Sequence, residues 1–215
     1  MTTIDAASGW SLVVPVKRLT NAKSRLAEFA GPLRSDLALA MASDTVMAAV
    51  NCPGVTAVFA VTDDPRAAEI LGDLGAHIVG GEPGTGLNPA LMHGASVAAR
   101  RCPAQGICAL SADLPALRPG ELGQLLADAA QHEQAFLADA AGIGTTLYTA
   151  APGARFAPAF EGASRLQHLE GGAVELAGAA APALRRDVDT PDDLRAAVAL
   201  GVGPHTAKLV ARAGW

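Results

Sequence analysis

Three aspartates in two distant stretches of the sequence are candidate ligands for a metal ion. Asp113 follows an apolar run over residues 106–110 that predicts a buried strand, and it precedes a proline turn. Ligands of open α/β sheets bind outside the carboxyl ends of the strands, so we expect Asp113 in such a crevice. An alternative is that Asp113 only initiates the turn or caps the helix that follows.

Asp187 and Asp189 lie two positions apart, a spacing that on a strand places both carboxylates on one face. Two like charges side by side are unfavourable unless a cation lies between them. Magnesium accepts carboxylate and phosphate oxygens together, so the pair indicates a magnesium site. The acids that follow have another explanation, because Thr190, Pro191 and Asp193 form the pattern of a helix capping box.

Basic residues gather at the end of the first predicted strand, residues 12–17, and directly after it. Two of the three lysines in the chain, Lys17 and Lys23, lie there within seven residues, and Arg18 and Arg25 accompany them. Such a cluster suits phosphate oxygens, which lysine binds as a point charge and arginine as a bidentate fork. A solvated basic loop is the alternative, since no Walker A pattern is present.

Glycine-rich segments offer backbone N–H groups to a ligand. Residues 80–86 contain four glycines and lead into a helix that Asn88 is expected to cap. Residues 142–146 and 162–165 open a strand and a short helix, and their N–H groups and hydroxyls suit a phosphate or a carboxylate. Each segment alone also fits an ordinary turn or helix cap.

The combined set of residues favours one chemistry. Three carboxylates with lysines, and without a Cys/His ligand set, favour magnesium over zinc. Nucleotidyl transfer uses such a set, because the metal bridges the attacking oxygen, the α-phosphate and the leaving pyrophosphate while lysines neutralise the triphosphate. This reaction needs no protein nucleophile, and the sequence shows no Cys/His or Ser/His arrangement that would supply one.

The elements that must position these residues alternate between strand and helix. The patterns predict strands over residues 12–17, 56–61, 77–79 and 106–110, a basic loop over 18–30, and helices over 34–50, 66–74, from 88 onward and over 119–130. Such alternation predicts a mainly parallel sheet with helices on both faces and the loops at one edge. Two more strands, over 134–138 and 144–149, are followed by irregular sequence to residue 160.

Neither a repeat nor a disordered linker divides the chain of 215 residues. We therefore expect one nucleotidyltransferase domain over residues 1–215. Its nucleotide-binding half would cover residues 11–130, and its acceptor- and metal-binding half would cover residues 131–200.

Composition argues against several classes of protein. Half of the residues are hydrophobic and 17% are charged, which excludes a disordered chain, and the net charge of −5 argues against a nucleic-acid binder. No apolar run reaches the length of a membrane span. The three cysteines lack C-x-x-C spacing and fit a reducing cytosol, so we expect a cytoplasmic protein.

Several short motifs are similar to those of a known family. They are Val-Pro-Val-Lys-Arg-Leu at residues 14–19, Ala-Lys-Ser-Arg-Leu at 22–26, Gly-Leu-Asn at 86–88, Ser-Ala-Asp-Leu-Pro at 111–115, Gly-Thr at 144–145, Ser164, and Asp-Val-Asp-Thr-Pro at 187–191. With them the chain resembles the 2-phospho-L-lactate and phosphoenolpyruvate guanylyltransferases of deazaflavin coenzyme F(420) biosynthesis over nearly its whole length. The resemblance implies a three-layer α/β/α fold with a mixed, mainly parallel sheet, of the Rossmann-like nucleotide-diphospho-sugar transferase type, also called glycosyltransferase-A.

The resemblance also implies a reaction, the transfer of GMP from GTP to a phosphorylated three-carbon acid with release of pyrophosphate. It implies the magnesium ligands Asp113, Asp187 and Asp189, and the acceptor-phosphate contacts Thr145 and Ser164. A further acceptor contact falls at Glu161 or Gly162. We prefer Gly162, because the acidic side chain of Glu161 would oppose an anionic acceptor.

For the nucleotide, we expect Lys17, Lys23 and Arg25 to hold the triphosphate and Gly86, Leu87 and Asn88 to meet the guanosine. Lys17, Lys23 and Asp113 are the expected catalytic residues. The expected partners are GTP and a small phosphorylated acid, without nucleic acid or membrane, and the product would pass to the next enzyme of the pathway. The chain would act as a monomer or a homodimer.

Two other functions are compatible with the residues. Another nucleotidyltransferase of the same fold, of the molybdenum-cofactor or sugar-phosphate type, usually has a glycine-rich loop with an arginine where this chain has residues 14–17. A non-catalytic GTP-binding module would not need Asp187 beside Asp189. The sequence leaves the acceptor open between phosphoenolpyruvate, 2-phospho-L-lactate and 3-phosphoglycerate, which differ by little more than a double bond or a hydroxyl.

Overall fold

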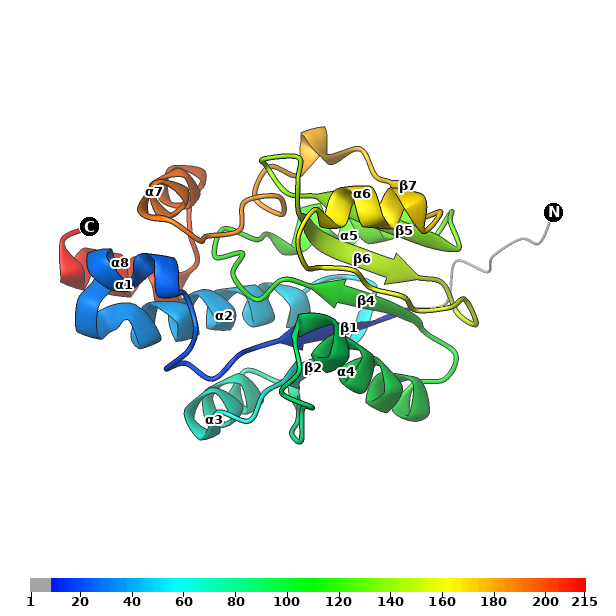
Figure 1. Ribbon diagram of the computed structural model, residues 1–215, viewed down its shortest axis with the longest axis horizontal. Helices are drawn as coiled ribbons and strands as arrows, with labels where there is room; N and C mark the ends of the chain where they lie inside the picture. Colours follow the sequence, from blue (N-terminus) through cyan, green and yellow to red (C-terminus); the bar gives the residue numbers. More distant parts are fainter. Residues whose placement is uncertain (1–8) are drawn as a thin grey trace.

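The computed structural model describes residues 9–215, which fold around one seven-stranded sheet (Figure 1). The strand order is β3-β2-β1-β4-β6-β5-β7. Their bounds are β1 Trp10–Pro15, β2 Val55–Val61, β3 His77–Val79, β4 Gly106–Leu110, β5 Gln134–Ala138, β6 Thr145–Ala150 and β7 Val174–Glu175. All neighbours are parallel except at β6, which runs antiparallel to both β4 and β5. The predicted mixed, mainly parallel sheet is confirmed.

Helices cover both faces of this sheet, which confirms the three-layer α/β/α arrangement (Figure 1). Their bounds are α1 Ala27–Ala30, α2 Arg34–Val50, α3 Pro65–Asp73, α4 Leu87–Arg101, α5 Pro119–Ala129, α6 Ser164–Glu170, α7 Pro191–Leu200 and α8 Pro204–Ala213. The core on one face is formed with α2, α3 and α5, and the core on the other face with α4. Helices α7 and α8 pack with α1 against the far side of α2, which is therefore buried on both sides.

The alternation of side chains along β1 separates the two cores. Leu12 and Val14 lie in the core under α2, whereas Val13 lies in the core under α4, and all three are fully buried. Gly94 of α4 lies directly over this strand, because a Cβ there would be 2.5 Å from Val13 Cγ1. This close crossing fixes α4, whose first turn follows the glycine-rich segment after β3.

Most predicted elements match the observed ones, and the helix over residues 34–50 matches to the residue. Residues 187–189, whose spacing we interpreted as that of a strand, form no strand of the sheet. Residues 18–30 are not simply a loop, since they include the 3₁₀ turn Ser24–Leu26 and the single-turn helix α1. The two-residue strand β7 had no signal in the sequence.

Strands from both predicted halves of the chain belong to the same sheet. The predicted domain of residues 1–215 also includes residues 1–8, which lie outside the described residues. Among the helices formed by residues 9–215, none combines the length and the hydropathy needed to cross a membrane.

Candidate active site

Asp113 lies in the turn after β4, and three other segments hold this turn. The N–H of Leu114 donates to Thr45 Oγ1 of α2 at 3.0 Å, and the N–H of Gly203 donates to the carbonyl of Pro115 at 2.8 Å. The N–H of Val188 donates to the carbonyl of Asp113 itself at 3.1 Å. Asp113 is therefore at the carboxyl end of β4, as predicted, and its backbone is fixed from outside the strand.

Asp187 and Asp189 reach the same place without the predicted strand. Val188 between them is fully buried and is bound to the Asp113 carbonyl, so its two neighbours flank the Asp113 turn. The carbonyl of Arg185 accepts the N–H of Ala140 at 2.8 Å, which ties the segment to the end of β5. The pair is thus positioned by isolated backbone hydrogen bonds rather than by a strand ladder.

Crowding of these acids raises the pKa of one of them. Burial, followed by the charges of Asp113, Asp139 and Asp189, raises the pKa of Asp187 to about 7. Asp139, in the turn after β5, was not among the predicted site residues. The like-charge cluster that the sequence predicted is therefore present, with Asp139 as an added member.

Lys23 lies between the carboxylates. Its ammonium donates to Asp113 Oδ2 and, at 2.8 Å, to Asp189 Oδ1. Burial opposes its charge, but the two carboxylates outweigh this penalty and raise the pKa of Lys23. Lys23 is also the only residue other than glycine with a positive φ among residues 9–215, at 53°, a conformation that often marks functional sites.

The other two predicted cations, Arg25 and Lys17, are exposed, and the charges of both act on Asp189. Arg25 Nη1 lies 3.5 Å from Asp189 Oδ2, and Lys17 is exposed at the end of β1. Burial raises the pKa of Asp189, but the charge and hydrogen bond of Lys23, with smaller contributions from Arg25 and Lys17, lower it overall. The structure therefore brings Lys23 and Arg25 into contact with the carboxylate cluster, and Lys17 near enough for its charge to lower the pKa of Asp189.

The donor set of this cluster fits a hard cation. Three carboxylates supply only oxygen ligands, which magnesium prefers, and burial followed by the neighbouring negative charges raises the pKa of Asp187. Within residues 9–215, no three Asp, Glu, His or Cys side chains are already arranged around one point as metal ligands. A divalent cation would therefore have to displace the Lys23 ammonium from Asp113 and Asp189.

The predicted acceptor residues also meet. Thr145 begins β6 and Ser164 begins α6, and Ser164 Oγ donates to Thr145 Oγ1 at 3.1 Å. Ser164 is fully buried, and Thr145 is buried as well, with 8% exposure. Gly162 is exposed, with a φ of 68°. The N–H groups of residues 143 and 144 are bound by the Asp139 carboxylate, so this segment offers less to a ligand than predicted.

Glu161 does not point at the acceptor residues. Its Oε1 accepts the N–H of Leu87 at 3.0 Å, so the carboxylate occupies the first turn of α4. Asn88 is not the cap of this helix, which begins at Leu87 after Gly86, and Asn88 Oδ1 instead accepts the N–H of Phe160 at 2.8 Å. The predicted guanosine segment, residues 86–88, is thereby tied to the acceptor segment by two hydrogen bonds.

His168 is a residue of this region that sequence reasoning missed. Its Nδ1 lies 3.0 Å from Thr145 Oγ1, and its ring stacks on Tyr148 and Phe136 with centroid distances of 4.7 and 5.3 Å. Burial lowers the pKa of His168 to about 4, so the ring is neutral at pH 7. The available signal was its position one helical turn after Ser164, which places both on one face of α6.

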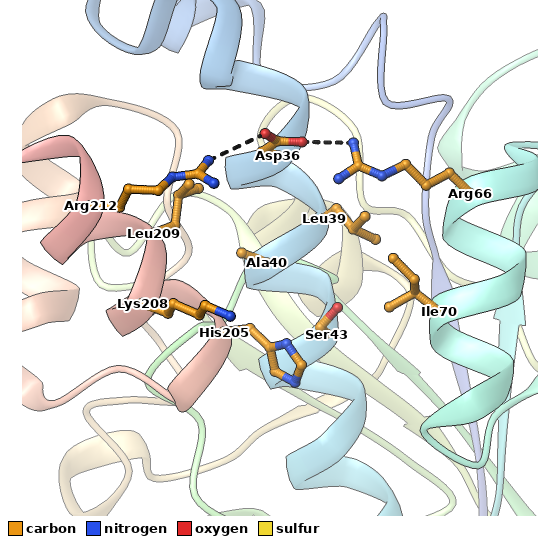
Figure 2. Close-up of a pocket in the computed structure, with 10 residues that line it drawn as sticks. All are labelled: Asp36, Leu39, Ala40, Ser43, Arg66, Ile70, His205, Lys208, Leu209 and Arg212. Atoms are coloured by element: carbon orange, nitrogen blue, oxygen red, sulfur yellow. Dashed lines mark hydrogen bonds and ion pairs between the residues drawn. The ribbon is translucent and has the colours of Figure 1, made fainter.

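A separate groove of about 220 Å³ lies between α2, α3 and α8 (Figure 2). Arg66 from α3 and Arg212 from α8 approach Asp36 of α2 from opposite sides. None of the predicted site residues lines this groove, whose other lining residues are Leu39, Ala40, Ser43, Ile70, His205, Lys208 and Leu209.

Comparison with solved structures agrees with the fold. A protein from Desulfovibrio desulfuricans assigned as a nucleotide-diphospho-sugar transferase matches with a TM-score of 0.70 at 16% identity, covering 96% of each chain. A CMP:2-keto-3-deoxy-manno-octonic acid synthetase in complex with CTP matches with a TM-score of 0.58 at 17% identity, covering 90% of this chain and 98% of the other. The predicted nucleotide-diphospho-sugar transferase type of fold is confirmed.

Comparison of sequences identifies the family. A phosphoenolpyruvate guanylyltransferase of Thermomonospora curvata is 59% identical over 211 residues, covering 98% of this chain and 92% of the relative. One of Streptomyces coelicolor is 58% identical over 204 residues, covering 94% of this chain and 96% of the relative. A family model described as "Guanylyl transferase CofC like" matches residues 10–214. This chain therefore belongs to the CofC-like guanylyl transferase family, as the resemblance of its motifs predicted.

Proposed function

We propose that this guanylyltransferase moves GMP from GTP to the phosphate of phosphoenolpyruvate and releases pyrophosphate, as a step of coenzyme F(420) biosynthesis. The observation that carries the proposal is the convergence of Lys23, Asp113, Asp187 and Asp189 at the carboxyl edge of the sheet. The acceptor is chosen from the names of relatives such as those 59% and 58% identical, which are described as phosphoenolpyruvate guanylyltransferases. 2-Phospho-L-lactate is the second candidate acceptor.

Asp113, Asp187 and Asp189 would hold magnesium. The chemistry that such a metal would supply is neutralisation of charge on the α-phosphate and the departing pyrophosphate. The Lys23 ammonium, which here binds Asp113 and Asp189, would turn toward the triphosphate when GTP binds, together with Lys17 and Arg25. We thus propose that the ammonium of Lys23 neutralises the carboxylates before the substrate binds and neutralises the phosphates afterwards.

The acceptor and the base would bind on the two sides of this cluster. Thr145, Ser164 and Gly162 are proposed to hold the acceptor phosphate, with Gly162 exposed and Thr145 less buried than Ser164. Residues 86–88 are proposed to meet the guanosine. An oxygen of the acceptor phosphate forms a bond to the α-phosphorus of GTP while the bond to pyrophosphate breaks, so no protein residue is modified.

We also propose that the enzyme acts in the cytoplasm as a monomer or a homodimer. Its substrates and its product are small anions that no nucleic acid or membrane surface needs to present. The product, a guanylylated three-carbon acid, would be passed to the next enzyme of the pathway.

Pyrophosphate release tests this function. GTP, ATP and CTP are each combined with phosphoenolpyruvate, 2-phospho-L-lactate or 3-phosphoglycerate, with magnesium or with excess EDTA. We expect release with GTP, phosphoenolpyruvate and magnesium, and a fall of about 1,000-fold or more with EDTA, because the metal contributes several kcal/mol. Release only with CTP would indicate a cytidylyltransferase, and GTP binding without release would indicate a non-catalytic module. Either result would overturn the proposal.

A further inference from the structure

Both ring nitrogens of His168 are used inside the protein. The backbone N–H of Ala159 donates to Nε2 at 2.9 Å, and Nδ1 lies 3.0 Å from Thr145 Oγ1. The ring is 2% exposed and is surrounded by Phe136, Tyr148 and Phe160. His168 thus connects the irregular acceptor segment to the first residue of β6.

These partners determine where the proton of the ring lies. A backbone N–H can only donate, so Nε2 must be the unprotonated nitrogen. A neutral imidazole then carries its single proton on Nδ1, which faces Thr145 Oγ1 and shares this proton with the backbone of Ser164. Burial in the aromatic cluster, which lowers the pKa of His168 to about 4, supports the neutral form.

The same reasoning gives the direction of the Thr145 hydroxyl. Its oxygen accepts from Ser164 Oγ at 3.1 Å and from His168 Nδ1, which together use both of its lone pairs. With Ser164 Oγ as the donor of their shared bond, the Thr145 proton has no other hydrogen-bond partner among residues 9–215. Thr145 is buried but keeps more exposure than Ser164 or His168, so its proton is the one of this group that a bound anion would approach.

We propose that His168 is a positioning residue, whose Nδ1–H and Nε2 fix the Thr145 hydroxyl and the acceptor segment so that Thr145 donates to the acceptor phosphate. The role rests on the proposed function, in which Thr145 contacts that phosphate. His168 touches neither substrate itself. Through Ala159 it also orders the segment that carries Phe160, whose N–H is bound by Asn88 of the nucleotide side.

Three substitutions separate this role from simple packing. His168→Asn keeps a donor near the place of Nδ1, His168→Gln keeps an acceptor near the place of Nε2, and His168→Phe keeps only the stacked ring. His168→Gln and His168→Phe are expected to raise KM for phosphoenolpyruvate about 10- to 100-fold with KM for GTP unchanged, since one hydrogen bond to a charged group is lost. His168→Asn should keep KM for phosphoenolpyruvate near the wild-type value. His205→Phe in the groove should change neither KM.

Two results would overturn the positioning role. One is an unchanged KM for phosphoenolpyruvate in folded His168→Phe, and the other is equal behaviour of the Asn and Gln variants, which packing alone would give. If the variants do not fold, ¹⁵N NMR of the wild-type ring decides, because a proton on Nε2 or a cationic ring at pH 7 contradicts the proposal. Failure of the proposed function looks different: the wild type itself would release no pyrophosphate, or Thr145→Val would leave KM for the acceptor unchanged.

Discussion

Two regions of the molecule place basic side chains around aspartates, and they differ in how much water reaches them. In the candidate active site, the Lys23 side chain is 13% exposed and bridges Asp113 and Asp189. In the groove between α2, α3 and α8, Arg66 and Arg212 are 54% and 63% exposed where they meet Asp36 (Figure 2). Similar residue types therefore lie in two different environments.

The difference decides what each region can do. An exposed ion pair is screened by water and contributes about 0–1 kcal/mol. In the buried cluster, desolvation and like charges raise the pKa of Asp187 to about 7, so the site favours any cation that can approach its acids. Burial of the bridging cation Lys23, rather than the number of basic residues, distinguishes the candidate site from the groove.

Lys23→Met in the candidate site should change the kinetics far more than a matching substitution in the groove. It removes the cation that neutralises the carboxylates and is proposed to bind the triphosphate, so we expect kcat/KM for GTP to fall about 100- to 1,000-fold. Arg66→Met removes a cation from the groove and serves as the matched control, with unchanged kinetics. Similar losses in both variants would show that burial does not separate the regions.

The pH dependence of the free energy of unfolding tests whether the His168 ring is buried and neutral beside the acceptor residues. The pKa of His168 is about 4 in the folded protein and 6.5 ordinarily, so between these values the unfolded chain binds the extra proton. The contribution of His168 to the free energy of unfolding is therefore present above pH 6.5. It is lost as the pH falls from 6.5 toward 4, by about 3 kcal/mol in total. Urea unfolding of wild type and His168→Phe at pH 7 and pH 4.5 checks this. An identical loss of stability in both proteins would contradict the buried neutral ring.

Thr45→Val tests the support of the Asp113 turn. The substitution leaves the N–H of Leu114 without its acceptor inside the protein, which should lower the free energy of unfolding by about 1–3 kcal/mol. The activity at low temperature should fall as well, because the turn positions Asp113. A stable variant with full activity would mean that the turn is held by its other hydrogen bonds alone.

Asp36→Asn in the groove should have the smallest effect. Both of its ion pairs are exposed, so the free energy of unfolding should change by less than about 0.5 kcal/mol, and the kinetics should not change. Chemical denaturation and pyrophosphate release measure the two quantities. A large kinetic effect would mean that the groove takes part in the reaction.

The fold was largely predictable from the sequence because its signals are local. Apolar runs such as residues 106–110 and the helical pattern of residues 34–50 lie in single continuous stretches, and their alternation predicts the parallel sheet. The family resemblance added the antiparallel part of the mixed sheet. The strand expected at residues 187–189 was wrong because the N–H of Val188 binds the carbonyl of Asp113 outside any ladder.

The candidate site was predictable in its members but not in its contacts. Asp113 and the Asp187/Asp189 pair could be found from a strand end, a spacing and a resemblance. The bridging position of Lys23 depends on its positive φ and on partners 90 and 166 residues away, which no local pattern encodes. His168 and Glu161 likewise bind partners that lie close only in the folded chain.

The rate of pyrophosphate release by Asp113→Asn tests the central claim most directly. The substitution keeps the size of the side chain and the backbone hydrogen bonds of the turn but removes one charge from the carboxylate cluster. With saturating GTP, phosphoenolpyruvate and magnesium, we predict a rate at least about 100-fold below wild type, with Tm unchanged within a few degrees. Near-normal turnover by the folded variant would contradict the assignment of this cluster as the catalytic metal site.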